Sequence, residues 1–197
     1  MSRRFVAIVA ALTLAAVGSV TPRLAQAQPA SVSDPSRERA QVLLDEGNAA
    51  LNAGAYVDAL AKFRAAHEIF PSPKLLLNIG TTLRQLGRNA EAATIYEQYL
   101  AHPEHDPARE AELHALITQI DETVAFVLVR SRTPGSTVRL DGRILGMGPF
   151  DKRVRVEPGD HTVVAAKAGL RDGVVTLRLA ARDRRTVDAE PVAPSVV

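Results

Sequence analysis

The sequence has no cysteine and no tryptophan, and aromatic residues make up only 4% of its 197 residues. Without cysteine, the chain cannot form a disulfide framework, a thiolate zinc site, a catalytic thiol or a lipid-modified N-terminal cysteine. The apolar fraction of 46% is nevertheless ordinary for a globular protein. Because large rings are scarce, we expect alanine to fill much of the core, which suits closely packed helices better than a large β-sandwich.

The chain also lacks a strong excess of charge of one sign, although its charges are unevenly distributed. The formal net charge is +2. Residues 28–125 carry 8 basic and 14 acidic side chains, whereas residues 126–197 carry 13 basic and 8 acidic ones. Nucleic-acid binding would favour a strongly basic domain with aromatics, so we expect no nucleic-acid partner. The basic second half favours binding to an acidic polymer or to an acidic protein face. The alternative interpretation is that its arginines are simply exposed on strands. The opposite charges also suggest that the two halves dock on each other.

The N-terminus has the pattern of a secretory signal peptide. Arg3 and Arg4 precede an apolar-rich stretch of 16 residues, 5–20, which is shorter than the roughly 20 residues that span a bilayer. An Ala-x-Ala site then predicts removal of residues 1–27 by cleavage between Ala27 and Gln28. We therefore expect export to the periplasm or cell envelope, with no stable transmembrane segment after processing.

Helix-start signals recur in the next hundred residues. After a Pro/Ser/Ala-rich segment, 28–34, that predicts a flexible lead-in, Asp34-Pro35, Ser72-Pro73 and Asp106-Pro107 each place a side-chain oxygen at an N-cap and proline at the first helical position. Apolar residues then recur at helical spacing, which predicts a helical region over 35–123 whose last helix spans about 107–122.

The helical region contains an internal repeat of 33 residues. This offset relates Gly47 to Gly80, Gly54 to Gly87, Ala59 to Ala92 and Phe63 to Tyr96. The repeated pattern resembles the tetratricopeptide repeat (TPR). It consists of a large apolar residue, a small residue, Ala-x-x-x-aromatic and a closing proline. The positions that carry the resemblance are Gly47, Ala59, Phe63, Pro71, Gly80, Ala92 and Tyr96. The resemblance implies antiparallel helix pairs in a short α-solenoid of two repeats, which the last helix caps.

The same resemblance implies a peptide-binding surface on the concave face of the first helix of each pair. The positions on that face are Asn48, Leu51, Asn52, Lys74, Asn78, Thr81, Arg84 and Gln85, with Gln41, Leu44 and Leu77 beside them. The alternative interpretation is a solvated helix face without a ligand.

After about residue 124 the pattern changes to short strands separated by turn residues. Asp141-Gly142 predicts a two-residue hairpin, and Pro158-Gly159 a tight turn. Further turns are expected at 146–149, at Gly169 and at 172–173, with a last strand over 186–190. The pattern predicts six or seven strands in a small β-sandwich over 124–190, followed by a disordered tail over 191–197.

The order and spacing of these turns resemble the PEGA domain. The matching residues are Asp141, Gly142, Gly146, Pro149, Pro158, Gly159 and Gly169. The resemblance implies a surface-associated module with no chemistry of its own. The predicted fold class is therefore α+β in separate modules, with TPR-like helical hairpins followed by a PEGA-like β-sandwich.

The sequence offers little that points to catalysis. His102, Glu104, His105 and His114 contain metal-ligating groups, but a proline-containing loop without a third fixed ligand predicts an exposed loop. No nucleophile-elbow motif occurs, and Gly146-x-Gly148 precedes no helix that could bind phosphate. We therefore expect no enzyme activity, no metal and no cofactor.

The favoured interpretation is a non-catalytic envelope adaptor or scaffold. Its helical groove would bind a protein or peptide, and its β-domain would dock to a partner or to cell-wall polymer. One alternative is a structural envelope or surface component that self-assembles without a peptide-binding groove. The other is a hydrolase whose site has no recognisable motif.

Overall fold

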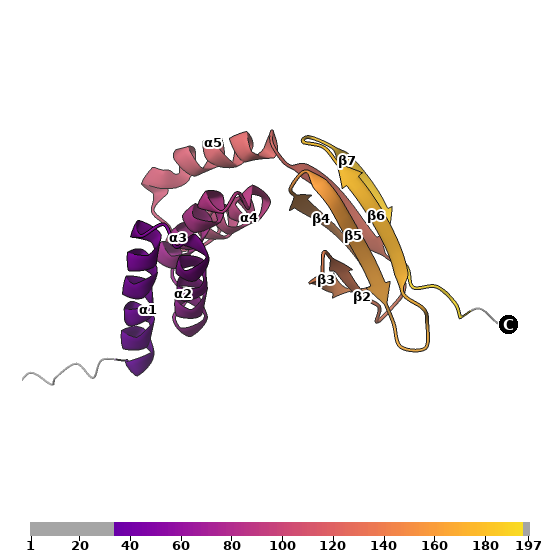
Figure 1. Ribbon diagram of the computed structural model, residues 1–197, viewed down its shortest axis with the longest axis horizontal. Helices are drawn as coiled ribbons and strands as arrows, with labels where there is room; N and C mark the ends of the chain where they lie inside the picture. The colour runs from indigo at the N-terminus through magenta and orange to yellow at the C-terminus, as the bar shows by residue number, and fades with distance from the viewer. Residues whose placement is uncertain (1–33, 195–197) are drawn as a thin grey trace, which may run out of the picture. The chain divides into compact units, whose positions relative to one another are not determined.

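The computed structural model describes residues 34–194 (Figure 1). Within these residues, five α-helices come first and seven β-strands follow in two sheets, as an α+β class predicts. The predicted signal peptide, the cleavage site between Ala27 and Gln28 and most of the lead-in lie outside the described residues. None of the helices described combines the length and apolar character needed to span a membrane.

Capping side chains explain where two of the five helices begin. The helices are α1 (Pro35–Asn52), α2 (Tyr56–Ile69), α3 (Pro73–Gln85), α4 (Asn89–Leu100) and α5 (Glu110–Asp121). The carboxylate of Asp34 accepts from the Ser36 N–H at 2.9 Å, and the Ser72 hydroxyl accepts from the Leu75 N–H at 3.4 Å. The first two predicted N-caps are thereby confirmed.

The third predicted helix start is wrong in detail. The carboxylate of Asp106 does accept from the Ala108 N–H at 3.0 Å, but the turn that it caps is the short 3-10 helix Pro107–Arg109. The α-helix begins only at Glu110. The local signal marks the place where the chain turns, but it does not distinguish the two helix types.

The sequence repeat corresponds to a repeated packing contact. A Cβ placed on Gly47 would lie 2.6 Å from the Phe63 ring, and a Cβ placed on Gly80 would lie 2.5 Å from the Tyr96 ring. Both rings are buried. In each case a glycine on the first helix of a pair makes room for an aromatic ring on the second, 16 residues later.

Alanine fills much of the helical core, as the composition predicts. Ala59 and Ala66 on α2, and Ala92 and Ala93 on α4, are completely buried. Leu113, Ile117 and Ile120 add the apolar side of α5 to the same cluster. This small-residue packing lets the helices approach closely with few aromatic residues.

Two sheets form the C-terminal part. The strands are β1 (Ala125–Ser131), β2 (Thr137–Leu140), β3 (Arg143–Met147), β4 (Phe150–Val156), β5 (Gly159–Ala166), β6 (Gly173–Leu179) and β7 (Arg184–Asp188). The three-stranded sheet has the order β4-β1-β7, and the four-stranded sheet has the order β3-β2-β5-β6. Inward-facing residues of both sheets, such as Val127 and Val163, share one buried cluster, as expected of a small sandwich.

Three predicted turns are confirmed by positive φ angles. Asp141 (φ 50°) and Gly142 (φ 80°) join β2 to β3, the combination that a two-residue type I′ hairpin requires. Gly159, after the exposed Pro158, has φ 142°, and Gly169 has φ 81°. Glycine tolerates this region of backbone space without a steric cost.

The turn predicted at 146–149 is wrong in its first half. Gly146 lies within β3 and pairs with Val138, because the strand continues to Met147 past a bulge at which Leu145 has no paired residue on β2. The chain reverses at Gly148-Pro149 instead. A Cβ on Gly148 would lie 2.4 Å from the Thr133 carbonyl oxygen, so Gly148 is the glycine that this turn needs.

The end of the chain also differs from expectation. Gly173 is the buried first residue of β6 rather than a turn residue. Glycine is needed there because a Cβ would lie 1.8 Å from the Glu190 carbonyl oxygen. The last strand begins two residues earlier than predicted, since pairing with β1 sets its register. Val192 exchanges two backbone hydrogen bonds of 2.8 Å with Arg171, which orders a residue of the predicted tail.

Candidate partner-binding surfaces

The predicted concave-face residues divide into exposed and packed groups. Asn52, Lys74, Thr81, Arg84 and Gln85 are exposed, and Asn48 and Asn78 are half-buried. Leu51 packs against the helical core, so its side chain has a structural role. The exposed members lie on α1 and α3, which are the first helices of the two predicted pairs.

A hollow of about 470 Å³ opens at the start of this face. Its wall includes Arg37, Gln41, Leu44, Phe70, Lys74 and Leu75, from α1, the end of α2 and the start of α3. The structure therefore brings Gln41, Leu44 and Lys74 of the predicted face together. Asn48, Asn78 and the remaining predicted residues do not line this hollow.

Three of these wall residues, Arg37, Phe70 and Leu75, are not among the residues predicted for this face. The guanidinium carbon of Arg37 lies 5.1 Å from the centre of the Phe70 ring, a cation–π distance. Arg37 precedes Gln41 by four residues, so helical spacing alone places it on the predicted face. Phe70 carries no such signal, because only the turn after α2 directs it toward α1.

The chemistry of the helical hollow is amphipathic. Leu44, Phe70 and Leu75 provide apolar surface, and the cationic groups of Arg37 and Lys74 border it. Among residues 34–194, neither Arg37 nor Lys74 forms an ion pair with a carboxylate within 4 Å. The hollow suits a ligand with an apolar group beside an anionic one.

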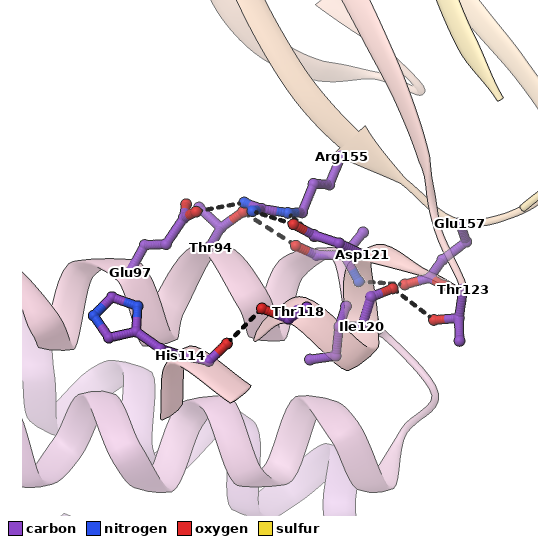
Figure 2. A network of polar contacts seen from close by, with 10 residues as sticks. Thr94, Glu97, His114, Thr118, Ile120, Asp121, Thr123, Arg155 and Glu157 are labelled. Carbon is purple, nitrogen blue, oxygen red and sulfur yellow. Dashed lines mark hydrogen bonds and ion pairs between the residues drawn. The ribbon is translucent and has the colours of Figure 1, made fainter. Parts of the chain in front are cut away.

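The helices and strands belong to one compact unit, and Arg155 on β4 joins them (Figure 2). Its Nε donates to Asp121 Oδ1 at 2.5 Å, and its Nη2 donates to Asp121 Oδ2 at 3.1 Å. Its Nη1 lies 2.8 Å from Glu97 Oε1. The hydrogen bonds that Arg155 donates to Asp121 raise the pKa of Arg155, against the effect of burial. The acidic helical half and the basic strand half therefore meet through a bidentate ion pair.

Glu157, in the turn between β4 and β5, provides a second connection. Its Oε1 accepts from the Ala90 N–H at 2.6 Å, in the first turn of α4. α4 has no side-chain cap of its own, because its N-cap residue is Arg88. A carboxylate at this position satisfies an otherwise unpaired N–H and interacts favourably with the helix dipole.

His161 holds the same turn from the other side. Its Nδ1 lies 2.7 Å from Asp141 Oδ2, and its Nε2 lies 2.7 Å from the Glu157 carbonyl oxygen. Both partners are acceptors, so the arrangement is fully satisfied only when both ring nitrogens carry protons. Burial lowers the pKa of His161, but the hydrogen bonds to Asp141 and Glu157 raise it, and the pKa lies above its usual value.

Two of the histidines considered as metal ligands, His102 and His105, form ordinary hydrogen bonds. His105 Nδ1 lies 2.6 Å from the His102 carbonyl oxygen, and His105 Nε2 lies 2.7 Å from Glu110 Oε1. In the described part of the chain, no group of three or more histidine, aspartate or glutamate side chains has the arrangement of a metal site.

A scan against models of known protein families and a search of curated proteins find no match to this chain. The TPR and PEGA resemblances accordingly stay predictions that rest on the residues quoted above.

Proposed function

We propose that this chain is a non-catalytic binding protein of the cell envelope, exported by its N-terminal signal peptide. In this proposal a TPR-like helical region binds a protein partner, and a PEGA-like β-domain acts as a docking module. The observation that carries the proposal is the amphipathic hollow between α1 and α3. It lies on the face that the repeat pattern predicts for peptide binding, and it offers apolar surface beside two cations that have no carboxylate partner among residues 34–194.

The chemistry of the helical hollow favours a peptide with an acidic residue or a C-terminal carboxylate next to an apolar side chain. Arg37 and Lys74 supply the positive charge, and Leu44, Phe70 and Leu75 supply the apolar contact. Charge-assisted hydrogen bonds to a carboxylate are stronger than neutral ones, so these two cations would fix the orientation of the peptide.

Photo-cross-linking tests the proposal. Gln41 would be replaced by a photo-reactive amino acid in the mature chain, residues 28–197, in its native envelope. The matched control carries the same amino acid in place of Ala61, an exposed residue of α2 outside the hollow. The cross-linked proteins would be identified by mass spectrometry.

We expect discrete partners to be cross-linked from position 41 and not from position 61. The double substitution Arg37→Glu and Lys74→Glu should abolish their capture, with the helical content unchanged by circular dichroism. Identical cross-links from both positions, or capture that survives the double substitution, would refute a binding role for the hollow.

The second candidate is a self-assembling structural component, which exposed apolar residues on the sheet edges favour. Ile144 and Met147 on β3 are 60% and 65% exposed, and Val174 on β6 is 59% exposed. β3 and β6 are the two edge strands of the four-stranded sheet. Exposed edges of this kind can pair with another chain.

Sedimentation velocity over a range of concentrations separates the two candidates. Self-assembly predicts concentration-dependent oligomers that the substitutions Ile144→Lys and Val174→Lys disperse. A binding protein predicts a monomer whose sedimentation these substitutions leave unchanged.

A further inference from the structure

The outer face of the three-stranded sheet gathers arginines around one aromatic ring. The strand register places Arg155 and Arg184 on either side of Phe126, and Arg153 beside Leu128. The guanidinium carbons of Arg153, Arg155 and Arg184 lie 4.7, 5.5 and 5.9 Å from the centre of the Phe126 ring. Phe126 and Leu128 are half-buried, so this face has an apolar floor bordered by cations.

Only one of these three cations is neutralised. Arg155 is paired with Asp121 and Glu97. Across residues 34–194, neither Arg153 nor Arg184 takes part in an ion pair with a carboxylate within 4 Å. Like charges on neighbouring strands repel each other, and a cation–π contact only partly offsets this repulsion. The electrostatic potential at this cluster is therefore positive, and binding of an external anion would reduce the repulsion among the arginines.

The same residues line two hollows. The smaller, of about 240 Å³, is lined by Phe126, Leu128, Arg153, Arg184, Arg185 and Thr186. The larger, of about 650 Å³, shares Phe126, Arg153 and Arg184 and adds the cations Arg143 and Lys152 and the apolar Ile144.

The carboxylates of the larger hollow are already occupied. Glu91 is paired with Arg88 at 2.5 Å, and both Glu97 and Asp121 are paired with Arg155. Its remaining cations therefore have no acidic partner in the wall. A ligand for this surface must bring negative charge, and the combined space accommodates several residues of a chain.

We infer that the outer face of the three-stranded sheet, centred on Phe126, Arg153 and Arg184, binds an acidic segment of a protein partner. Arginine favours carboxylates because its planar guanidinium donates two parallel hydrogen bonds. Phe126, Leu128 and Ile144 add apolar contact surface among the cations. A peptide that alternates acidic and apolar side chains satisfies both features, whereas a phosphate polymer satisfies only the arginines. This inference rests on the docking role proposed for the β-domain, but the site shares no residue with the helical hollow, so the tests of the two surfaces can fail independently.

Fluorescence anisotropy with the mature chain, residues 28–197, tests this inference. The probe is a fluorescein-labelled peptide of alternating glutamate and leucine, and a second peptide alternates glutamate and serine. The site variant combines Arg153→Gln, Arg184→Gln and Arg185→Gln. The control variant removes the same charge from exposed positions outside both hollows, through Arg39→Gln, Arg109→Gln and Arg178→Gln.

We expect the site variant to bind the glutamate–leucine peptide at least about tenfold more weakly than the wild type at low ionic strength, and the control variant to stay within about twofold. The glutamate–serine peptide should bind more weakly than the glutamate–leucine peptide. In the wild-type chain, the peptide should shift the NMR amide signals of Phe126 and Thr186, which does not depend on any variant folding correctly.

Several results would overturn the inference. Equal losses in both variants would show attraction to bulk charge. Equal affinity for the two peptides, or tighter binding of inorganic polyphosphate to the same site, would show that an acidic–apolar protein segment is not the ligand. Absence of peptide binding to the wild-type chain would refute the site itself.

Discussion

Because α1 and α2 approach closely at Gly47, we expect the effect of Gly47→Ala on the free energy of unfolding to change sign with the residue at position 63. The substitution Gly47→Ala raises helix propensity, which in an open helix would stabilise the protein by about 1 kcal/mol. In this protein the new Cβ would lie 2.6 Å from Cε1 and 2.7 Å from Cδ1 of the buried Phe63 ring. Overpacking of this kind costs about 1–3 kcal/mol, so the net effect should be a destabilisation of about 1 kcal/mol.

The substitution Phe63→Leu removes the ring that causes the clash. By itself this change should destabilise the protein, because it leaves unfilled space in the core. In the Phe63→Leu background, however, Gly47→Ala should stabilise the protein by about 0.5–1 kcal/mol, because only the propensity term remains. The two residues should therefore show a coupling energy of about 1–3 kcal/mol in a double-mutant cycle.

Urea unfolding followed by far-UV circular dichroism measures all four corners of this cycle. Unchanged urea dependence among the variants would confirm that the differences are differences in stability. The substitution Ala49→Gly, at an exposed position of α1, measures the propensity term separately in the same helix. A Gly47→Ala variant that is equally stabilised or equally destabilised in both backgrounds would refute close helix packing as the reason for the glycine.

Three further predictions concern the contacts between the helices and the strands. Arg155→Gln should destabilise the protein by about 1–3 kcal/mol, whereas Arg182→Gln, which breaks only an exposed ion pair, should change stability by less than about 1 kcal/mol; equal losses in urea unfolding would contradict this difference. Glu157→Ala should increase hydrogen exchange at the N-terminal amides of α4, because it removes their carboxylate cap, and unchanged exchange would exclude this capping role. The pKa of His161 is raised in the folded state, so its contribution to stability is fully present below its unfolded pKa of about 6.5 and is lost as the pH rises through the folded pKa. His161→Gln should reduce this loss of stability with rising pH. The loss due to His105, whose pKa the hydrogen bond to Glu110 also raises, should remain. An unchanged pH profile of thermal unfolding would refute the assignment.

Local patterns predicted the elements of this fold well because their causes are local. Capping by Asp34 and Ser72 depends on hydrogen bonds to residues two or three positions away. The hairpin at Asp141-Gly142 depends on backbone angles that these two residues adopt readily. Where a partner from a distant strand sets the outcome, prediction was less accurate. Gly146 has the sequence context of a turn, yet it pairs with Val138 inside β3, next to a bulge at Leu145 that only the pairing with β2 defines.

The candidate site was predictable only in part for the same reason. Helical spacing placed Gln41, Leu44 and Lys74 on one predicted face, and the structure brings them into one hollow. Phe70 joins them only because the end of α2 lies against α1. The charge asymmetry of the two halves suggested that they dock on each other, but nothing in the composition identified Arg155 as the residue that joins them.

Side chains close together in the chain control the order of helices before strands, the repeated glycine–aromatic spacing, the alanine-rich helical core and the main turns, so these features are predictable from the sequence. Packing between distant segments sets which glycines are sterically required, where β3 and β7 begin and end, and which arginines find a carboxylate partner. Arg155 meets Asp121 and Glu97, whereas Arg153 and Arg184, on the same face of the same sheet, lie near the Phe126 ring and have no carboxylate partner in the described part of the chain. The physical reason is that an ion pair depends on distances of a few ångströms between segments far apart in the chain, and only the folded packing sets those distances.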